Sequence, residues 1–458
     1  MKEIKASPPL HFIKPNLNIR FTKFIAFNFP VVQYFKTSIR RVDVEDIETL
    51  AEKYLELQNG KARILIAFRH PNADDPFSLV QLFWRKLPNY FKKKKIKLDR
   101  FVHFHFVWDR GIPLWAGNAV AKLYSKLGGI PIHRGKVDWK GLNSIREHFV
   151  NSPYPVLIAP EGATNGHIEI LSPLEPGLAQ LTVWCLEDLK KQNRNELVYI
   201  IPMGIKYKFK KENWEGLNKI LNSFVETLGK DYLENEAVPN DDLSSMNEEK
   251  KIAYTKLMQV FNSILTLLET YFQTYFFKQK QVAHSFDIEK RIQFLAENIL
   301  STEESFFGLK PRGSIIDRCR KLEQASWDWI YREDYSSEKS LLLQSLENRI
   351  AFDAKRQDWN MRLIESLVAI QNNYIPTKPS FERFMDVTLL LHDTLTKILT
   401  GSGQKRPIVE NLDSTVKIGK PILVNDYIEE INSSRLGAKS AMNKITLELS
   451  QRLTDLMK

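Results

Sequence analysis

Short apolar runs alternate with amphipathic stretches between residues 46 and 207. Four of the runs have the length of a strand: 64–68, 101–108, 156–159 and 197–205. Helical periodicity occupies the intervals near 76–87, 114–127, 138–150 and 175–191. Strands that alternate with helices are typical of a largely parallel sheet covered by helices. The pattern therefore predicts an α/β domain over 46–207.

Beyond residue 207 the apolar positions recur with helical spacing. Residues 250–277 place seven apolar side chains on one broad face: Ile252, Leu257, Val260, Phe261, Ile264, Leu265 and Leu268. Further helices are predicted over 286–300, 314–331, 337–373 and 380–399, and Gly401 ends the last of them. Apolar faces of this kind are typical of helices that pack on one another. We therefore predict an all-helical region over 208–410.

A strand-like run over 416–424 and an amphipathic helix over 433–457 close the sequence. Pro421 suits an edge strand or a strand end. If this tail returns to the α/β sheet, the helical region is a large insertion; otherwise it forms the C-terminal region of the fold. The predicted domains are a lead-in over 1–45, the α/β domain over 46–207, the helical region over 208–410 and a strand–helix tail over 411–458. The predicted fold class is α/β, with a mixed, largely parallel sheet flanked by helices.

The composition fits a globular protein that is soluble or bound to a membrane surface. Of its 458 residues, 43% are apolar and 26% are charged. Cys185 and Cys319 match no metal or redox spacing, so a reducing cytoplasmic setting is expected. No stretch approaches the ~20 apolar residues of a membrane-spanning helix. The nearest, 21–35, is interrupted by polar residues and is expected at an interface or in the core, and no signal-peptide pattern predicts export.

The excess of positive charge predicts an anionic partner. The formal net charge is +11, and the densest basic run is Lys92-Lys93-Lys94-Lys95. Nucleic acid and anionic lipid attract such a run, and a plain solvated loop is the alternative. Trp84, Tyr90 and Phe91 precede the lysines, and this mixture suits a lipid headgroup layer. We therefore favour an anionic membrane surface over nucleic acid, with the 21–35 segment and the lysines docking the protein peripherally.

His70 and Asp75 are the candidate catalytic residues. The apolar run over 64–68 gives way to Arg69 and His70, and Asp75 follows five positions after the histidine. A buried strand would deliver the imidazole to its carboxyl end, where the carboxylate orients it. A histidine held in this way accepts a proton from a hydroxyl near neutral pH. In the alternative, His70 only ends the strand, and Asp75 with Pro76 begins a helix.

Three further segments fit the same chemistry. The first runs from Gly128 to Gly135, where glycines allow close approach to a ligand and Arg134 suits a phosphate or carboxylate. In the second, a buried strand leads into Pro160-Glu161-Gly162, which places a carboxylate at the edge where open α/β sheets bind ligands. The third is the strand that contains Ile201-Pro202. Taken alone, each segment also fits an ordinary turn or strand.

In this order the four segments resemble the glycerolipid acyltransferase family, which includes the lysophosphatidate acyltransferases. The family pattern is His-x4-Asp, then Gly-x-x-Phe-x-x-Arg, then Phe-Pro-Glu-Gly-Thr-Arg-Ser, then an apolar run into Pro. Here it appears over about 60–207 as His70…Asp75, Gly128…Arg134, Pro160-Glu161-Gly162 and Ile201-Pro202. Pro131 and Ala159 replace the two phenylalanines, and Thr164 and Asn165 replace the Arg and Ser of the third segment.

The resemblance implies acyl transfer without an enzyme nucleophile. His70 would take the proton of an acceptor hydroxyl, Asp75 would hold its ring, and backbone amides near Gly162 would stabilise the oxyanion. The donor would be acyl-CoA or acyl-carrier protein, with no other cofactor and no metal. The expected substrate-binding residues are Gly128, Arg134, Glu161, Gly162 and Pro202. The sequence has no Gly-x-Ser-x-Gly elbow, which argues against a serine hydrolase.

Three alternatives remain beside a glycerolipid or lysophospholipid acceptor. Because Thr164 replaces an arginine that the family uses for the acceptor's phosphate, the acceptor is alternatively a non-phosphorylated alcohol. The chain is alternatively a non-catalytic protein that binds lipid or nucleic acid.

His103 and His105 would lie on one side of a strand and suggest a metal, but no third ligand is near in the sequence. We expect them to line the sheet or an acyl cleft.

Overall fold

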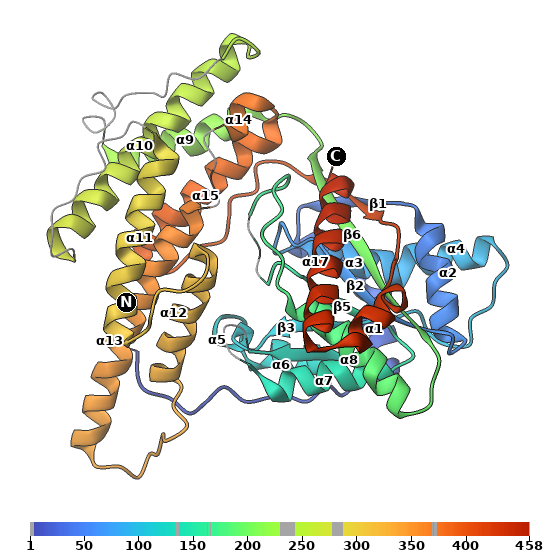
Figure 1. The fold of residues 1–458 in the computed structure, drawn as a ribbon. Coiled ribbons are helices and arrows are strands. Elements are labelled where there is room, and N and C mark those ends of the chain that lie inside the picture. The colour runs from blue at the N-terminus through green and yellow to red at the C-terminus, as the bar shows by residue number, and fades with distance from the viewer. Residues whose placement is uncertain are drawn as a thin grey trace. The chain divides into compact units, whose positions relative to one another are not determined.

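The protein, described here from a computed structural model, divides into two compact units. The structure describes residues 4–133, 137–162, 164, 166–229, 243–276, 287–368, 370 and 373–457. One unit comprises His11–Lys210 and Asn411–Lys458, and the other comprises Met1–Leu10 and Lys211–Glu410. We call them the α/β unit and the helical unit (Figure 1). Residues 11–45, which we predicted as part of a separate lead-in, belong to the α/β unit, as does the C-terminal tail.

The α/β unit is built on one mixed sheet. In chain order its described strands are β1 (Ile39–Glu45), β2 (Ala62–Phe68), β3 (His105–Asp109), β4 (Gly129–Ile132), β5 (Val156–Ile158), β6 (Leu197–Phe209), β7 (Leu412–Ile418) and β8 (Ile422–Leu423). Their order across the sheet is β1-β7-β6-β2-β5-β3-β4, and β8 pairs with β6. The pairings are parallel except that β7 and β8 run antiparallel to β6. The predicted fold class, a mixed and largely parallel sheet flanked by helices, is confirmed.

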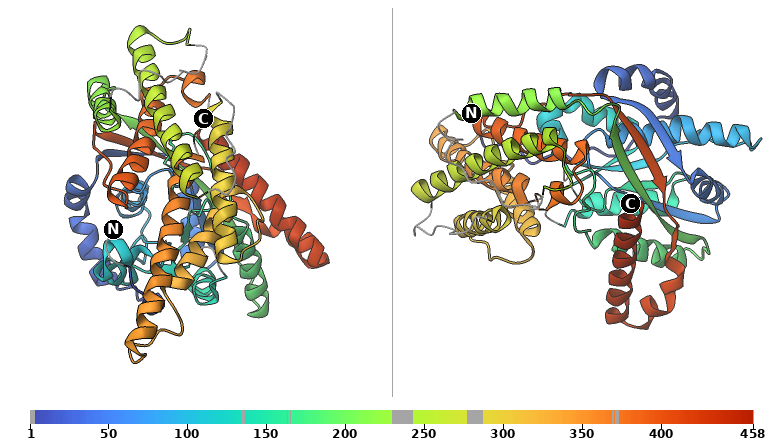
Figure 2. Two further views of the ribbon diagram at one scale, coloured as in Figure 1. Left: turned by 90° about the vertical axis from the view of Figure 1, so that its left-hand side faces the viewer. Right: turned by 90° about the horizontal axis from the view of Figure 1, so that it is seen from above.

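Helices cover both faces of this sheet. On one face lie α1 (Ile19–Lys36), α2 (Ile47–Gln58), α3 (Asp75–Gln81), the π-helical turn η1 (Leu82–Lys86) and α4 (Leu87–Lys93). On the other lie α7 (Trp139–Asn151), α8 (Gly177–Lys191) and α17 (Arg435–Met457). Shorter helices complete the unit: α5 (Ile112–Ala116), α6 (Asn118–Lys126), η3 (Val424–Tyr427) and α16 (Ile428–Ser433). Seen from above, the blue N-terminal helices and the red α17 lie on opposite sides of the strands (Figure 2).

The 21–35 segment lies within α1. The helix begins at Asn18, whose side chain accepts the backbone N–H of Phe21. One side of α1 is buried against the unit through Thr22, Ala26, Phe29 and Gln33. Throughout the described ranges, no helix has both the length and the apolar character needed to cross a membrane.

The helical unit contains α9 (Trp214–Leu228), α10 (Glu248–Tyr275), α11 (Ile288–Phe307), α12 (Ile315–Ile330), α13 (Leu341–Val368), α14 (Tyr374–Thr377) and α15 (Phe381–Thr400). Ion pairs join these helices. Arg318 of α12 binds Glu304 of α11 over 2.8 Å, and Arg362 of α13 binds Glu323 of α12. Such pairs fix which helices are neighbours more than they stabilise the unit.

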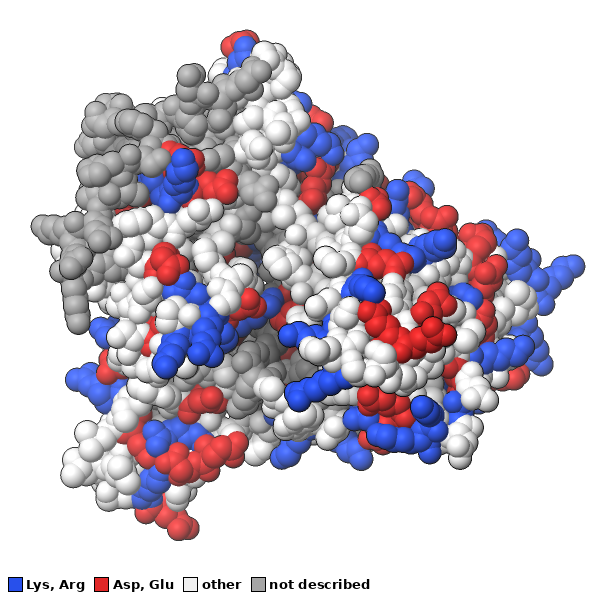
Figure 3. Space-filling view, in the orientation of Figure 1, with Lys and Arg blue, Asp and Glu red and all other residues white. Residues whose placement is uncertain are grey.

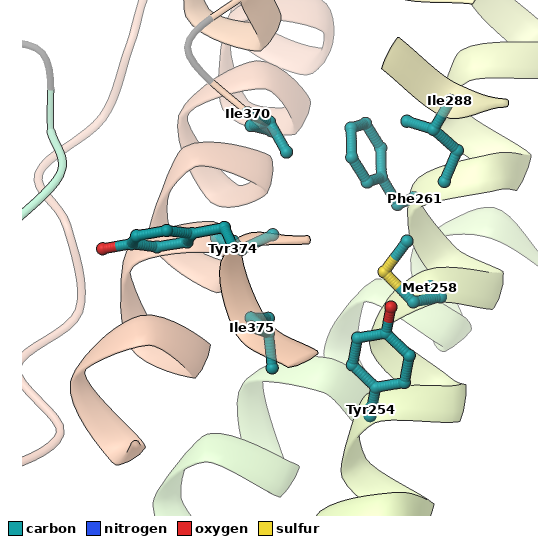
Figure 4. Close-up of a pocket in the computed structure, with 8 residues that line it drawn as sticks. Tyr254, Met258, Phe261, Ile288, Ile370, Tyr374 and Ile375 are labelled. Atoms are coloured by element: carbon teal, nitrogen blue, oxygen red, sulfur yellow. The ribbon is translucent and has the colours of Figure 1, made fainter. Parts of the chain in front are cut away.

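An apolar cavity lies inside the helical unit. Its lining side chains are Tyr254, Met258, Phe261, Ile288, Ile370, Tyr374, Ile375 and Val387. Residues of α10 and α11 face Ile370, Tyr374 and Ile375 across it (Figure 4). The free space is only about 10 Å³, whereas one water molecule needs roughly 10 to 15 Å³. The cavity is therefore a packing defect and not a ligand site.

Candidate active site

Strand β2 carries His70 to the carboxyl edge of the sheet. β2 lies between β6 and β5, both parallel to it, and all seven of its residues are buried. Burial on both faces explains why residues 64–68 of this strand form a continuous apolar run. The chain then turns, with the backbone N–H of Asp75 donating to the Asn72 carbonyl over 3.1 Å, and α3 begins at Asp75. This turn brings Asp75 back to His70.

His70 and Asp75 form a direct hydrogen-bonded pair. His70 Nδ1 lies 2.7 Å from Asp75 Oδ2, and the backbone N–H of Asn72 donates to the same oxygen over 3.0 Å. Asp75 is fully buried, whereas the side chain of His70 is 22% exposed. Because an ionised carboxylate only accepts, Nδ1 carries the proton and Nε2 is left as an acceptor. Asp75 therefore has both of its predicted roles, since it begins α3 and also orients the imidazole.

Tyr207 of β6 holds the other oxygen of Asp75. Its phenol donates to Asp75 Oδ1. Burial, and after it the charge of Asp75, raises the pKa of Tyr207 well above its usual value, so the phenol remains a donor. We did not predict this residue. Tyr207 follows Ile201, Met203 and Ile205 on one face of β6, and Tyr199 is a second buried tyrosine on that face, so the local alternation does not distinguish Tyr207.

We expect Tyr207→Phe to lower kcat about tenfold while the KM of each substrate stays unchanged. The substitution keeps the ring but removes a hydrogen bond to a charged group, which contributes roughly 1.5 to 3 kcal/mol. Because Tyr207 acts through Asp75, the same change should have no further effect on the residual activity of an Asp75→Asn protein. Steady-state kinetics of the two single variants and the double variant measure this. An equal loss in both backgrounds would make Tyr207 a packing residue.

Glu161 lies beside His70 and is buried. Its Oε1 accepts the backbone N–H of His70 over 2.8 Å, and its Oε2 accepts that of Ser172 over 2.9 Å. Burial raises the pKa of Glu161, while these two N–H groups and the charge of Arg69 oppose the rise. The carboxylate therefore ties the end of β2 to residue 172. Its predicted role in binding substrate stays a prediction.

Arg69 reinforces this connection. The side chain is fully buried, and its guanidinium donates to the carbonyls of His167 (2.5 Å), Ile168 and Ile170 (2.6 Å). A guanidinium presents several N–H donors in a fixed plane, so one side chain reaches three carbonyls of a curved segment. Arg69 and Glu161 thus hold residues 167–172, which we call the clamped loop, against the carboxyl end of β2.

Gly162 follows Glu161 in a left-handed backbone conformation, with a φ of +71°. Its N–H donates to the Ala159 carbonyl over 3.2 Å. This amide is therefore occupied within the turn. The predicted stabilisation of an oxyanion by backbone amides near Gly162 stays a prediction, and residues 163 and 165 lie outside the described ranges.

Pro202 lies on β6 next to the carboxyl half of β2, in register with Ala67. Its carbonyl accepts the N–H of Gly419 over 2.8 Å. In a strand, the N and C=O of one residue point to the same side. The backbone nitrogen of Pro202, which carries no hydrogen, therefore also faces the segment between β7 and β8. No ladder hydrogen bond is lost there, which explains why a proline is tolerated inside this strand.

Gly128 lies at the opposite edge of the sheet from His70. It precedes β4, and β4, β3, β5 and β2 are all parallel, so Gly128 is at the amino edge. A Cβ on Gly128 would approach His105 Nδ1 to 2.8 Å, and its φ is +77°, so packing explains the glycine. The structure does not bring Gly128 to His70, contrary to our expectation of a shared substrate site. Arg134 lies outside the described residues.

His103 and His105 are both buried: His105 begins β3, and His103 lies in the segment just before this strand. His103 donates from Nε2 to the Leu127 carbonyl and accepts at Nδ1 from Trp84, and His105 donates from Nδ1 to the Gly128 carbonyl. These partners hold both rings as neutral tautomers. Burial lowers the pKa of His103 to about 4 and that of His105 to about 3.

These two imidazoles predict a loss of stability in mild acid. The ordinary pKa of histidine is 6.5, so below that pH both imidazoles are protonated in the unfolded chain. In the folded protein they stay neutral until about pH 4 for His103 and about pH 3 for His105. We expect each histidine to cost roughly 2 kcal/mol of unfolding free energy at about pH 5 relative to neutral pH. Denaturant unfolding across this range measures the loss, and His103→Asn should remove about half of it. An equally steep loss in that variant would contradict the assignment.

Comparison with known proteins found no match for this chain among protein-family models, curated proteins or solved structures.

Proposed function

We propose that this chain is an O-acyltransferase that moves a fatty acyl group from a thioester donor to the hydroxyl of a glycerolipid or lysophospholipid. The observation that carries the proposal is the hydrogen-bonded pair of His70 and buried Asp75, which leaves Nε2 of a partly exposed imidazole as an acceptor. The resemblance of His70…Asp75 and Pro160-Glu161-Gly162 to the glycerolipid acyltransferase pattern supports this choice of reaction. The contact between Glu161 and the His70 backbone joins these two segments.

The proposed reaction needs one base that later acts as an acid. His70 Nε2 takes the proton of the acceptor hydroxyl while the oxygen attacks the thioester carbonyl, which forms a C–O bond and an oxyanion. The oxyanion collapses, the C–S bond breaks, and the departing thiolate of acyl-CoA or acyl-carrier protein receives the proton from His70. The products are an ester and a thiol, and the histidine is restored.

Asp75 stabilises the imidazolium that exists between the two proton transfers. A carboxylate within hydrogen-bonding distance of Nδ1 offsets the positive charge and keeps Nε2 directed outward. Tyr207 and the N–H of Asn72 hold this carboxylate, so its position is fixed before substrate arrives. Such preorganisation lowers the barrier because no group needs to reorient during the reaction.

The acceptor is a lipid, and we propose that the protein works in the cytoplasm while bound peripherally to a membrane. The net charge of +11 supports an anionic lipid surface. Thr164 in place of the family's arginine keeps a non-phosphorylated alcohol as the second candidate acceptor.

A transfer assay tests the proposal. Purified protein is incubated with labelled acyl-CoA or acyl-carrier protein and a panel of lysophospholipids, phosphate-free glycerolipids and long-chain alcohols. We expect a labelled ester with at least one acceptor. Release of free fatty acid with every acceptor would indicate a hydrolase instead. Lipid binding without turnover on any donor would support the non-catalytic alternative.

A further inference from the structure

The outer face of α1 is apolar although it is exposed. Six of its large side chains are exposed: Phe24, Phe27, Val31, Val32, Tyr34 and Phe35. Phe27 and Phe35 keep 78% and 77% of their surface accessible. Four of the six recur at helical spacing and form one stripe, opposite the buried stripe of Thr22, Ala26, Phe29 and Gln33. A surface helix normally exposes polar residues, and a contiguous exposed apolar stripe indicates an interaction site.

The segment that contains this stripe, and the segment of α3 to α4 on which α1 packs, are positively charged. Residues 11–42 contain no Asp or Glu but six basic residues: Lys14, Arg20, Lys23, Lys36, Arg40 and Arg41. Residues 76–98 likewise contain no acid but seven basic residues: Arg85, Lys86, Lys92, Lys93, Lys94, Lys95 and Lys97. Lys and Arg side chains gather at the edge of the α/β unit where α4 ends (Figure 3). The charge is thus complementary to an anionic surface.

The inner face of α1 packs against the helices that follow Asp75. Phe29 stacks on Phe77 of α3 with ring centres 5.6 Å apart and meets Trp84 of η1 edge-on, also at 5.6 Å. Gln81 Nε2 donates to Gln33 Oε1 over 2.7 Å. The stripe is therefore attached to the same helix that begins with the catalytic carboxylate.

Arg85 of η1 also binds the backbone of α1, at the point where Pro30 interrupts its hydrogen bonds. Proline has no N–H, so the Ala26 carbonyl one turn earlier loses its helical partner. Arg85 donates to that carbonyl over 2.9 Å and to the Phe27 carbonyl over 3.1 Å. A side chain of η1 thus satisfies the backbone of α1 at its interruption, which ties the two helices together.

We propose that α1 lies in the interface of an anionic bilayer, with Phe24, Phe27, Val31 and Phe35 among the acyl chains and the lysines at the end of α4 on the headgroups. Aromatic side chains flanked by cations and no acids suit this environment. A protein partner would instead require acidic groups to be brought against each cation. The inference deepens the proposed function, on which it rests for the lipid nature of the acceptor, because it names the surface that delivers the His70 edge to that lipid.

Sedimentation with lipid vesicles tests the docking surface. The full chain is mixed with vesicles of phosphatidylcholine alone, or of phosphatidylcholine and phosphatidylglycerol in equal parts. We expect strong binding to the anionic vesicles, and a loss of at least about tenfold in the combined Phe24→Ser, Phe27→Ser, Phe35→Ser variant, because three apolar rings no longer leave water. The inner face of α1 is untouched, so circular dichroism and thermal unfolding should match the parent.

A matched control comes from the helical unit. Leu341, Leu342 and Leu346 of α13 are also exposed, the first two at 82% and 73%. Their combined change to serine removes comparable apolar surface and should alter vesicle binding less than twofold. The proposal is overturned if this control loses binding while the α1 variant keeps it. It is also overturned if the parent binds neutral and anionic vesicles equally, or binds DNA and not vesicles.

Docking and catalysis are separated by two further measurements. His70→Ala protein should bind anionic vesicles as the parent does. The α1 variant should transfer acyl groups to a monomeric, water-soluble acceptor at the parent's rate but lose at least about tenfold on an acceptor embedded in vesicles. Vesicle binding through α1 with no transfer to any acceptor would refute the proposed function and leave the docking surface standing. Equal rates of transfer to vesicle-embedded lipid by the parent and the α1 variant would refute the docking surface and leave the proposed function standing.

Discussion

His70→Ala should reduce acyl transfer by at least about 1000-fold while the protein remains folded. A positioned general base contributes roughly 10²- to 10⁴-fold to a rate, and an alanine side chain offers no acceptor in place of Nε2. His70 is partly exposed, so its truncation leaves no large internal void. The measurement is kcat/KM with the best acceptor of the transfer assay, alongside thermal unfolding to verify the fold.

Asp75→Asn should lower the rate by about 10²- to 10³-fold, because the ring loses both its orientation and the charge that stabilises the imidazolium. An amide in this position also presents N–H donors to Tyr207 or His70, which favours the wrong ring tautomer. His11→Ala, which removes an exposed histidine of the same unit, serves as the control and should be silent. If His70→Ala retains full activity, the base lies elsewhere and this mechanism is wrong.

The sequence pattern predicted those elements whose burial is regular. The run at 64–68 became β2, and the intervals near 76–87, 138–150 and 175–191 became α3 to α4, α7 and α8, because one-sided or two-sided burial leaves a clear periodicity. β1 was missed because Arg40, Arg41, Asp43 and Glu45 make it appear polar, yet its pairing with β7 places it in the sheet. β4 was missed because four residues that include Gly129 and Pro131 have little strand character. The 416–424 run was predicted as one strand, but it contains the last residues of β7 and, after a break at Gly419–Pro421, the strand β8. Pro202 lies opposite this break, where its carbonyl accepts the N–H of Gly419.

In the candidate site, likewise, the contact between residues close in the sequence was predicted, and the contacts between distant residues were not. His70 and Asp75 are five residues apart, so a strand, a turn and a helix start were sufficient to predict their meeting. Tyr207 contacts Asp75 across 132 positions and Arg69 contacts Ile168 across 99. Neither partner leaves a mark in the local sequence, because the contact exists only once β6 and the clamped loop are placed beside β2. Gly128 shows the opposite error, since a family-like order of segments does not reveal at which edge of the sheet each segment lies.

Arg69→Met should lower kcat/KM by roughly 100-fold, although Arg69 is placed behind the site. Three carbonyls of the clamped loop, one buried and two part-buried, would lose charge-assisted donors, at a cost of roughly 3 to 4 kcal/mol in the free energy of unfolding. The loop would then move relative to the His70 backbone, and a displacement of about 1 Å in a catalytic group costs roughly 10²-fold in rate. Arg69→Lys should fall between the parent and the methionine variant, because an ammonium keeps the charge without the planar fork.

Arg63→Met is the matched control for this experiment. Arg63 lies in the first half of the same strand, is also buried, and donates to the Ser152 carbonyl over 2.8 Å and to Glu196 over 3.1 Å. Its loss should lower the unfolding free energy by a similar amount, since an equivalent buried charge leaves its partners unsatisfied. At a temperature where both variants are folded, however, only Arg69→Met should lose about 100-fold in kcat/KM. Equal activities in the two variants would mean that the clamped loop stabilises the unit without positioning His70, and Arg69 would then belong to the fold and not to the site.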